Sequence, residues 1–308
     1  MILFLSVMAI SCSEEVEEPT PTTLTESNTI VDVARANNFK ILVEALERVN
    51  LTEALSGSDV YTVFAPTDDA FIALLSELSL DNLDQVDDAT LTQILLNHVV
   101  KSKIVAADLE DGYATTLADG PESTKLSLLV SGTKLNNRSE ITAVDVMADN
   151  GVVHVINKVL TLPSAVNAAL SNPEFSSLVA ALTRKDLTTD FVATLSTEGP
   201  FTIFAPTNAA FQALLDSNDD WNGLGDIPKE TLELVLKYHV IVGSNITSDE
   251  IEDGVTPSMF DGGTITINTS NGVVITDGNN RTAEVKVANV QTFNGVIHAI
   301  DNVLLPKS

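Results

Sequence analysis

Cysteine is almost absent from this 308-residue chain, whose single copy is Cys12. One cysteine cannot form an intramolecular disulfide, which excludes the class of small secreted domains stapled by disulfides. It also excludes a structural zinc site built on several thiolates. Stability must therefore come from buried apolar cores, and an apolar content of 44% at this length is enough for two of them.

Positive charge is also scarce. The chain has 16 Lys and Arg against 43 Asp and Glu, which gives a formal net charge of −27. A polyanion repels the phosphates of nucleic acids, so we expect no DNA or RNA partner. The acidic residues have two interpretations. They form a solvated surface that resists aggregation, which we favour, or they bind Ca²⁺ diffusely.

Motifs of the common enzyme classes are missing. The sequence contains no HExxH, GxSxG, GxxxxGK[ST] or GxGxxG motif. One stretch, beginning at Asn218, superficially resembles a calcium loop. It fails because such a loop needs Asp at position one and Glu at position twelve, where this chain has Asn218 and Lys229. We therefore predict no catalytic residues, no metal site and no cofactor.

One stretch of the chain is present twice. VYTVFAPTDDAFIALL covers residues 60–75, and PFTIFAPTNAAFQALL covers residues 200–215. Each copy predicts a buried strand that ends at a proline and continues into a helix, with Thr67 or Thr207 as the N-cap residue.

Two further boxes recur in the same order. LLNHVV matches KYHVIV, and NGVVHVINKVL matches NGVIHAIDNVL. Three boxes repeated in one order indicate an internal duplication with a period of about 140 residues, which is an ordinary domain size. The period of the apolar residues further predicts helices early in each copy, strands late in each copy, a turn at Asn150-Gly151 and a closing strand over residues 152–160.

These three boxes together resemble the fasciclin-like domain family. The resemblance implies an α+β fold of two tandem fasciclin-like domains, each a wedge or sandwich of β-strands with helices packed around it. We assign residues 28–163 to domain 1 and residues 164–308 to domain 2. The resemblance also implies extracellular adhesion or ligand binding rather than catalysis.

The first eleven residues are apolar and too short to cross a bilayer, which needs roughly 20 residues. They predict the end of a lipoprotein-type signal peptide over residues 1–11. Ala9-Ile10-Ser11-Cys12 resembles the bacterial lipobox, which implies that Cys12 is lipidated. The pattern departs at Ala9, where Leu is usual, and no Lys or Arg precedes the apolar run, which favours a true start upstream of Met1.

Residues 12–27 are rich in Glu, Pro and Thr and have almost nothing to bury, so they predict an acidic disordered tether. The acidic cluster after Cys12 also resembles surface-export signals of some Gram-negative lipoproteins, with a plain solvated linker as the alternative. We therefore expect a lipid-anchored protein of the bacterial outer membrane that faces the exterior, with the periplasmic face as the second option.

All four histidines lie in the repeated boxes: His98, His154, His239 and His298. One interpretation is a metal pair or an acid–base site in each domain. The other, which we favour, is a buried imidazole that bonds the backbone and holds helix to sheet. Two histidines per domain are too few for a zinc site.

The resemblance also implies binding residues. In some animal members, an Asp-Ile-Met stretch and the Asn/Tyr-His box are associated with integrin binding and adhesion. The second domain has Asn-Val-Gln where the first has Asp-Val-Met. The alternative is that these residues serve the fold. With the remaining histidines, the candidate binding set is Asn97, His98, Asp145, Val146, Met147, His154, Tyr238, His239 and His298.

The functional prediction is an adhesion or extracellular ligand-binding module without enzymatic activity. Its expected partners are extracellular matrix, a glycan or a cell-surface protein, together with the membrane through the lipid anchor. Two alternatives stay open. One is a passive structural surface protein, and the other is an enzyme that uses the histidine pairs on an extracellular polymer.

Overall fold

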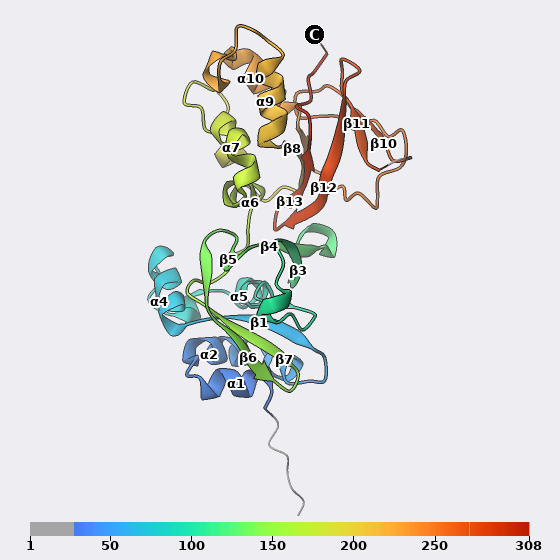
Figure 1. The fold of residues 1–308 in the computed structure, drawn as a ribbon. Helices are drawn as coiled ribbons and strands as arrows, with labels where there is room; N and C mark the ends of the chain where they lie inside the picture. Colours follow the sequence, from blue (N-terminus) through green and yellow to red (C-terminus); the bar gives the residue numbers. More distant parts are fainter. Residues whose placement is uncertain (1–27, 271, 308) are drawn as a thin grey trace, which may run out of the picture.

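The computed structural model describes residues 28–270 and 272–307. This part of the chain forms two domains stacked one after the other (Figure 1). The predicted signal peptide, Cys12 and the acidic tether lie outside the described residues.

Domain 1 places its helices before and after its first strand. The helices are α1 (Ile30–Ala36), α2 (Lys40–Arg48), α3 (Thr52–Leu55), α4 (Asp68–Glu77) and α5 (Asp88–Leu96), with short 3-10 turns η1 (Leu83–Gln85), η2 (Ala106–Asp108) and η3 (Pro121–Ser123). The strands are β1 (Tyr61–Pro66), β2 (Val99–Val100), β3 (Gly112–Asp119), β4 (Lys125–Ser131), β5 (Lys134–Leu135), β6 (Ser139–Ala148) and β7 (Gly151–Ile156).

The strands of domain 1 close into a barrel in the order β1-β2-β3-β4-β5-β6-β7. Closure is made by β1 and β7, which pair in parallel with Phe64 opposite His154, whereas the other neighbours pair antiparallel. A parallel pair needs a long crossover, and here the whole domain between β1 and β7 supplies it.

Domain 2 repeats the same order of elements. Its helices are α6 (Ala165–Ser171), α7 (Ser176–Leu182), α8 (Phe191–Thr194), α9 (Asn208–Asp216) and α10 (Lys229–Lys237), with 3-10 turns η4 (Pro173–Phe175) and η5 (Leu224–Asp226). Its strands are β8 (Phe201–Pro206), β9 (Val240–Val242), β10 (Thr266–Asn268), β11 (Val274–Thr276), β12 (Thr282–Thr292) and β13 (Gly295–Ile300).

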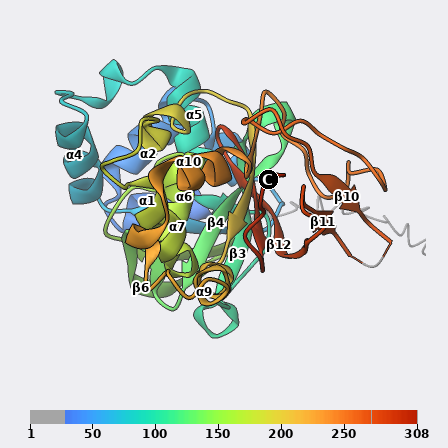
Figure 2. The ribbon, with the colours of Figure 1, turned by 90° about the horizontal axis from the view of Figure 1, so that it is seen from above.

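The sheet of domain 2 is open, in the order β10-β11-β12-β13-β8-β9. The central parallel pair is nevertheless the same, because β13 lies beside β8 with His298 opposite Phe204. Seen from above, β10, β11 and β12 lie on the opposite side of the molecule from helix α4 (Figure 2). The duplication therefore preserves the strand pair at the centre and changes the sheet edges.

The repeated box folds as its sequence predicts. Strand β1 ends at Pro66, and the hydroxyl of Thr67 accepts a hydrogen bond from the backbone N–H of Ala70 at 3.2 Å. Thr207 makes the same cap at the start of α9, with the N–H of Ala210 at 3.3 Å. Both threonines satisfy a backbone donor that the first helical turn leaves free.

Each domain has two apolar layers, one on either side of its central strands. Phe71 of α4 and Phe211 of α9 are buried in the layers between helices and sheet. Phe64 and Phe204 point to the other side and pack with late-strand residues such as Leu128 in domain 1. Because both faces of the central strands are covered, β1 and β8 are buried along their whole length.

Two predicted details differ from the structure. The closing strand β7 ends at Ile156 instead of 160, because the N–H of Leu160 donates to the ring of His98 rather than to the sheet. The hairpin turn is formed by residues 149–150, since Ala148 already pairs with Gly151. Gly151 is needed for another reason: at φ 154°, a Cβ there would lie 2.0 Å from the carbonyl oxygen of Tyr61.

The two domains are joined by direct polar contacts as well as by a short link. The hydroxyl of Ser127 on β4 accepts from the N–H of Gln291 on β12 at 3.0 Å. Tyr113 packs against the core of domain 2, and its hydroxyl accepts from the amide of Asn172 at 3.0 Å. Helix α6 is capped by Ser164, directly after Pro163. These contacts hold the two domains directly against each other.

Candidate functional site

His98 lies just beyond the C-terminal end of α5. Its Nδ1 lies 2.7 Å from the carbonyl oxygen of Ile94, and its Nε2 accepts from the N–H of Leu160 at 2.8 Å. A carbonyl can only accept and an N–H can only donate, so the neutral tautomer with the proton on Nδ1 is fixed. Burial lowers the pKa of His98 to about 4, against a weaker opposing effect of the Ile94 bond.

His239 repeats this arrangement in domain 2. Its Nδ1 lies 2.7 Å from the carbonyl oxygen of Val235, and its Nε2 accepts from the N–H of Leu304 at 2.9 Å. Burial lowers the pKa of His239 to about 4 as well. Each of these two histidines therefore ties the end of a helix to the segment that follows the last strand.

His154 and His298 occupy a second equivalent position, on the closing strands β7 and β13. The Nε2 of His154 lies 2.8 Å from the carbonyl oxygen of Ile104, and its Nδ1 accepts from the N–H of Asp145 at 3.3 Å. His298 makes the corresponding contacts, and each ring stacks on a phenylalanine at a centroid distance of 5.7 Å. Burial lowers the pKa of His298.

All four imidazoles are thus buried, and backbone groups occupy both nitrogens of each ring. Among the described residues, no carboxylate makes a hydrogen bond to any of these rings, although a histidine that acts as general acid or base commonly has such a partner. The structural interpretation of the histidines accounts for every one of their contacts.

Asn97 and Tyr238, which precede these histidines, are also buried. The amide of Asn97 donates to the carbonyl oxygens of Leu160 and Thr161 at 3.2 Å each. The hydroxyl of Tyr238 donates to the carbonyl oxygen of Thr264 at 2.6 Å and accepts from the N–H of Gly278 at 2.9 Å. The Asn/Tyr-His box therefore faces the interior in both domains.

The contacts of Tyr238 give a first prediction. We expect Tyr238→Phe to lower the free energy of unfolding of domain 2 by about 1–3 kcal/mol, because two part-buried hydrogen bonds, to the carbonyl of Thr264 and from the N–H of Gly278, are lost at about 0.5–1.5 kcal/mol each. Tyr61→Phe is the matched control, since the hydroxyl of Tyr61 bonds only the side chain of Asp59 at 3.2 Å. Equal effects of the two substitutions in urea unfolding would contradict the role of the Tyr238 hydroxyl.

Asp145 forms a β-bulge in β6, where the pairing with β7 slips. Its backbone has a left-handed φ of 59°, and its carboxylate accepts from the N–H of Ala106 at 2.8 Å. Asn289 stands at the equivalent bulge in β12 with the same φ of 59°, and its side-chain oxygen accepts from the N–H of Ser248 at 2.7 Å. In both domains a side-chain oxygen at the bulge accepts a backbone hydrogen bond, and this contact does not require a negative charge.

Within the candidate binding set, only the stretch at Asp145 reaches the surface. Met147 is 47% exposed, and Val144 on the same strand is also 47% exposed. Asp145 and Val146 are half-buried. The histidines, Asn97 and Tyr238 are buried, so a partner could touch this candidate set only along the outer side of β6.

Two asparagines that begin the third repeated box hold each domain together, although the sequence predicted only a turn at Asn150 and no role for Asn294. The side-chain oxygen of Asn150 accepts from the N–H of Ile30, and its amide donates to the carbonyl oxygens of Leu55 and Gly57. Asn294 repeats this set with three backbone groups of domain 2. The only sign of this role in the sequence was that Asn-Gly begins the third box in both domains.

A pair of arginines was also missed. Arg48 donates to the carbonyl oxygens of Leu83 and Val86 at 2.6 and 2.5 Å. Arg184 makes the equivalent bonds to Leu224 and Ile227 at 2.8 Å each. Each guanidinium thus fixes the segment ahead of α5 or α10, and only the three-dimensional contacts reveal this role.

No group of three or more His, Cys, Asp or Glu residues that could hold a metal ion occurs within the described part of the chain. In the loop that begins at Asn218, the polar side chains bond the backbone instead. Asp226 accepts from the N–H groups of Asn222 and Gly223, and Asn218 accepts from that of Asp220. These side chains stabilise a turn ahead of α10.

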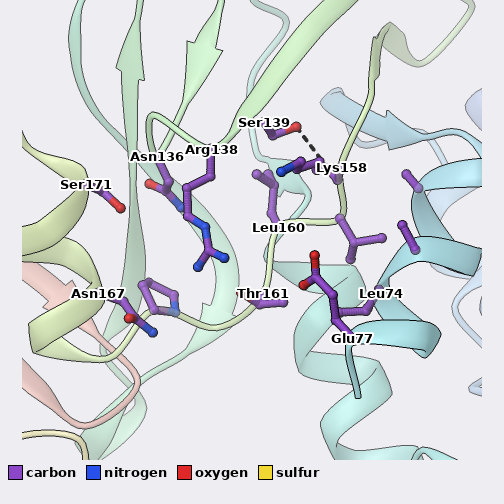
Figure 3. Close-up of a pocket in the computed structure, with 14 residues that line it drawn as sticks. Leu74, Glu77, Asn136, Arg138, Ser139, Lys158, Leu160, Thr161, Asn167 and Ser171 are labelled. Atoms are coloured by element: carbon purple, nitrogen blue, oxygen red, sulfur yellow. Dashed lines mark hydrogen bonds between the residues drawn. The ribbon is translucent and has the colours of Figure 1, made fainter. Parts of the chain in front are cut away.

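A pocket of about 70 Å³ lies between the domains (Figure 3). Arg138, Lys158 and Glu77 line it from domain 1, and Asn167 and Ser171 line it from helix α6 of domain 2. Sequence reasoning missed this site, because its residues lie far apart in the chain and come together only when the domains pack.

The fold consists of two tandem α+β domains. Equivalent buried histidines and asparagines make the same hydrogen bonds to the backbone in each domain. The pattern of the fasciclin domain matches residues 37–163 and 173–306. The chain belongs to the fasciclin domain family.

The chain is similar to proteins of several kinds. It is 30% identical to human periostin over 263 residues, which are 84% of this chain and 30% of periostin. It is 31% identical to pig transforming growth factor-beta-induced protein ig-h3 over 286 residues, which are 92% of this chain and 38% of that protein. The chain thus spans about a third of the length of these relatives.

Among solved structures, a FAS1 domain pair from the insect cell adhesion molecule fasciclin I is similar in fold. It has a TM-score of 0.50 and 19% identity, and the match covers 89% of this chain and 95% of that one. In the described part of the chain, the helices fall short of the length and apolar character that a bilayer crossing requires.

Proposed function

We propose that this chain is a surface adhesion or ligand-binding module, anchored to a bacterial outer membrane through a lipid on Cys12. The observation that carries the proposal is the order of its parts: an apolar leader, the lone cysteine, an acidic stretch and then two fasciclin domains. The similar domain pair of fasciclin I comes from a cell adhesion molecule.

The contacts within the domains support binding over catalysis. Both ring nitrogens of each of the four histidines hydrogen-bond to backbone groups, so neither nitrogen is free to act on a substrate. The contacts of Ser127 and Tyr113 hold the two domains in one arrangement. Many anchored copies would gain avidity from weak individual contacts, because effective concentration adds to affinity at a surface.

The anchor is tested by one substitution. We expect Cys12→Ala to move the protein from the membrane fraction to the soluble fraction, because the thiol is the predicted site of acylation and two or more acyl chains hold a protein stably. Ser13→Ala is the matched control and should stay in the membrane fraction. A Cys12→Ala variant that remains membrane-bound would show that the anchor lies elsewhere.

Binding is tested on an array of glycans and matrix proteins with the full chain, first with Ca²⁺ and then with EDTA. Saturable binding to one ligand class is the expected result, and its loss in EDTA would assign a role to calcium at the acidic surface. Binding to no class in either condition would favour a passive structural role instead.

A further inference from the structure

The pocket between the domains contains two of the few cations in this chain. Arg138 precedes β6, and Lys158 follows β7. Figure 3 shows both side chains turned over the same hollow, with Glu77 of α4 on one wall and Asn167 of α6 on the other. Both cations are exposed, so the hollow is open to solvent.

The charge at this pocket is opposite to that of the whole protein. The chain carries −27, yet neither Arg138 nor Lys158 forms an ion pair with any described residue. Glu77 is the single acid in the lining, so it offsets only one of the two cations. The pocket therefore has a local excess of positive charge.

Neutral hydrogen-bond donors complete the lining. The amide of Asn167 and the hydroxyl of Thr161 face the pocket, and neither side chain has a hydrogen-bond partner among the described residues. Cations surrounded by free amide and hydroxyl donors match the needs of an oxyanion, since a guanidinium binds carboxylate or sulfate through two parallel bonds.

We propose that this pocket binds a carboxylate or sulfate group carried on an acidic polysaccharide. Its volume of about 70 Å³ has room for one such group, and because the hollow is open to solvent the rest of the polymer can extend outside it. The acidic surface elsewhere repels anions over about 8 Å at physiological salt, so binding of an anionic group depends on the excess of positive charge at this pocket. The anion site itself is inferred from the pocket alone. That the anion belongs to a polysaccharide rests on the proposed function.

The test is a calorimetric titration of the full chain with three probes. These are sodium sulfate, an oligogalacturonate, and the same oligosaccharide with its carboxylates methyl-esterified. We expect the charged oligosaccharide to bind and the esterified one not to bind. Arg138→Gln and Lys158→Gln should each weaken binding about tenfold, the loss of one charge-assisted contact. Glu77→Gln should strengthen it, because the opposing charge is removed.

Two matched control variants each remove one positive charge outside the pocket. Lys103→Gln and Arg281→Gln change cations that lie outside the pocket and form no ion pair with the described residues, and both should bind as the unaltered chain does. Melting temperatures of all variants verify that they fold.

The outcomes separate the sources of the anion. If sulfate and the charged oligosaccharide both bind and both weaken in Arg138→Gln, the site takes an anion on a polymer. Sulfate binding alone with the same loss supports the site for a free anion. If pocket and control variants behave alike, or if the esterified oligosaccharide binds equally well, the proposal fails. Membrane anchoring through Cys12 is measured separately and is unaffected by these results.

Discussion

Asn150→Ala is expected to lower the free energy of unfolding of domain 1 by about 3 kcal/mol or more. The buried side chain of Asn150 bonds the N–H of Ile30 at 2.9 Å and the carbonyl oxygens of Leu55 and Gly57 at 2.7 and 3.3 Å. Alanine would leave these backbone groups without a partner, and each buried one costs about 1–3 kcal/mol. Asn294→Ala should have the same effect on domain 2.

The two domains can be measured apart in one chain. The only tryptophan, Trp221, packs against the core of domain 2, so its fluorescence reports the unfolding of that domain. Asn294→Ala should shift the fluorescence transition, whereas Asn150→Ala should shift circular dichroism and largely spare fluorescence.

The control for Asn150 is Asn157→Ala, because Asn157 is exposed and its side chain accepts one bond, from the N–H of Glu140 at 2.9 Å. A loss for Asn150→Ala no larger than that of Asn157→Ala would show that the buried bonds do not hold the helices to the sheet.

Acid is expected to destabilise both domains between pH 6.5 and 4. In the folded chain the pKa values of His98 and His239 are lowered to about 4, whereas the ordinary value of 6.5 applies after unfolding. The unfolded chain therefore binds more protons in this window. The stabilisation is complete above pH 6.5 and is lost as the pH falls towards 4, by about 3 kcal/mol per histidine.

The measurement is the free energy of urea unfolding at pH 7.5, 5.5 and 4.5 for the unaltered chain and for His239→Gln. The substitution lowers stability at every pH but should flatten the pH dependence of the tryptophan transition. Asp32 and Asp87, whose pKa values are lowered, lose their stabilisation mainly below this window. Glu233, whose pKa hydrogen bonds from Thr188 and Thr189 lower from 4.5, begins to lose it near pH 4.5. The test is therefore the difference in slope between His239→Gln and the unaltered chain, since Glu233 is present in both. An unchanged slope in His239→Gln would refute the assignment.

Much of the fold follows from short stretches of sequence. The run from Val60 to Leu75 contains the strand, the proline that ends it, the capping threonine and the apolar helical face. Each of these depends on neighbours within a few residues, so pattern and propensity suffice. The duplication then carries the same conclusion to residues 200–215, and the three boxes together indicate the family.

The roles of individual polar residues were harder to predict. Asn150 appeared only as a turn residue, although its partners are as much as 120 positions away in the chain. Asp145 appeared as a candidate binding residue, and nothing in the sequence indicated that its carboxylate also fixes the loop at Ala106. A hydrogen bond between distant segments leaves no periodic signal, and so no local pattern could reveal it.

The sequence by itself determined the two-domain architecture and the helix caps and favoured burial of the histidines, because apolar period and turn chemistry are local properties. Only the tertiary structure decided which backbone groups the histidines hold, where β7 ends and which sheet closes. It also decided that Arg138 and Lys158 meet α6 at one pocket. These features depend on distances between segments far apart in the chain, and packing alone sets such distances.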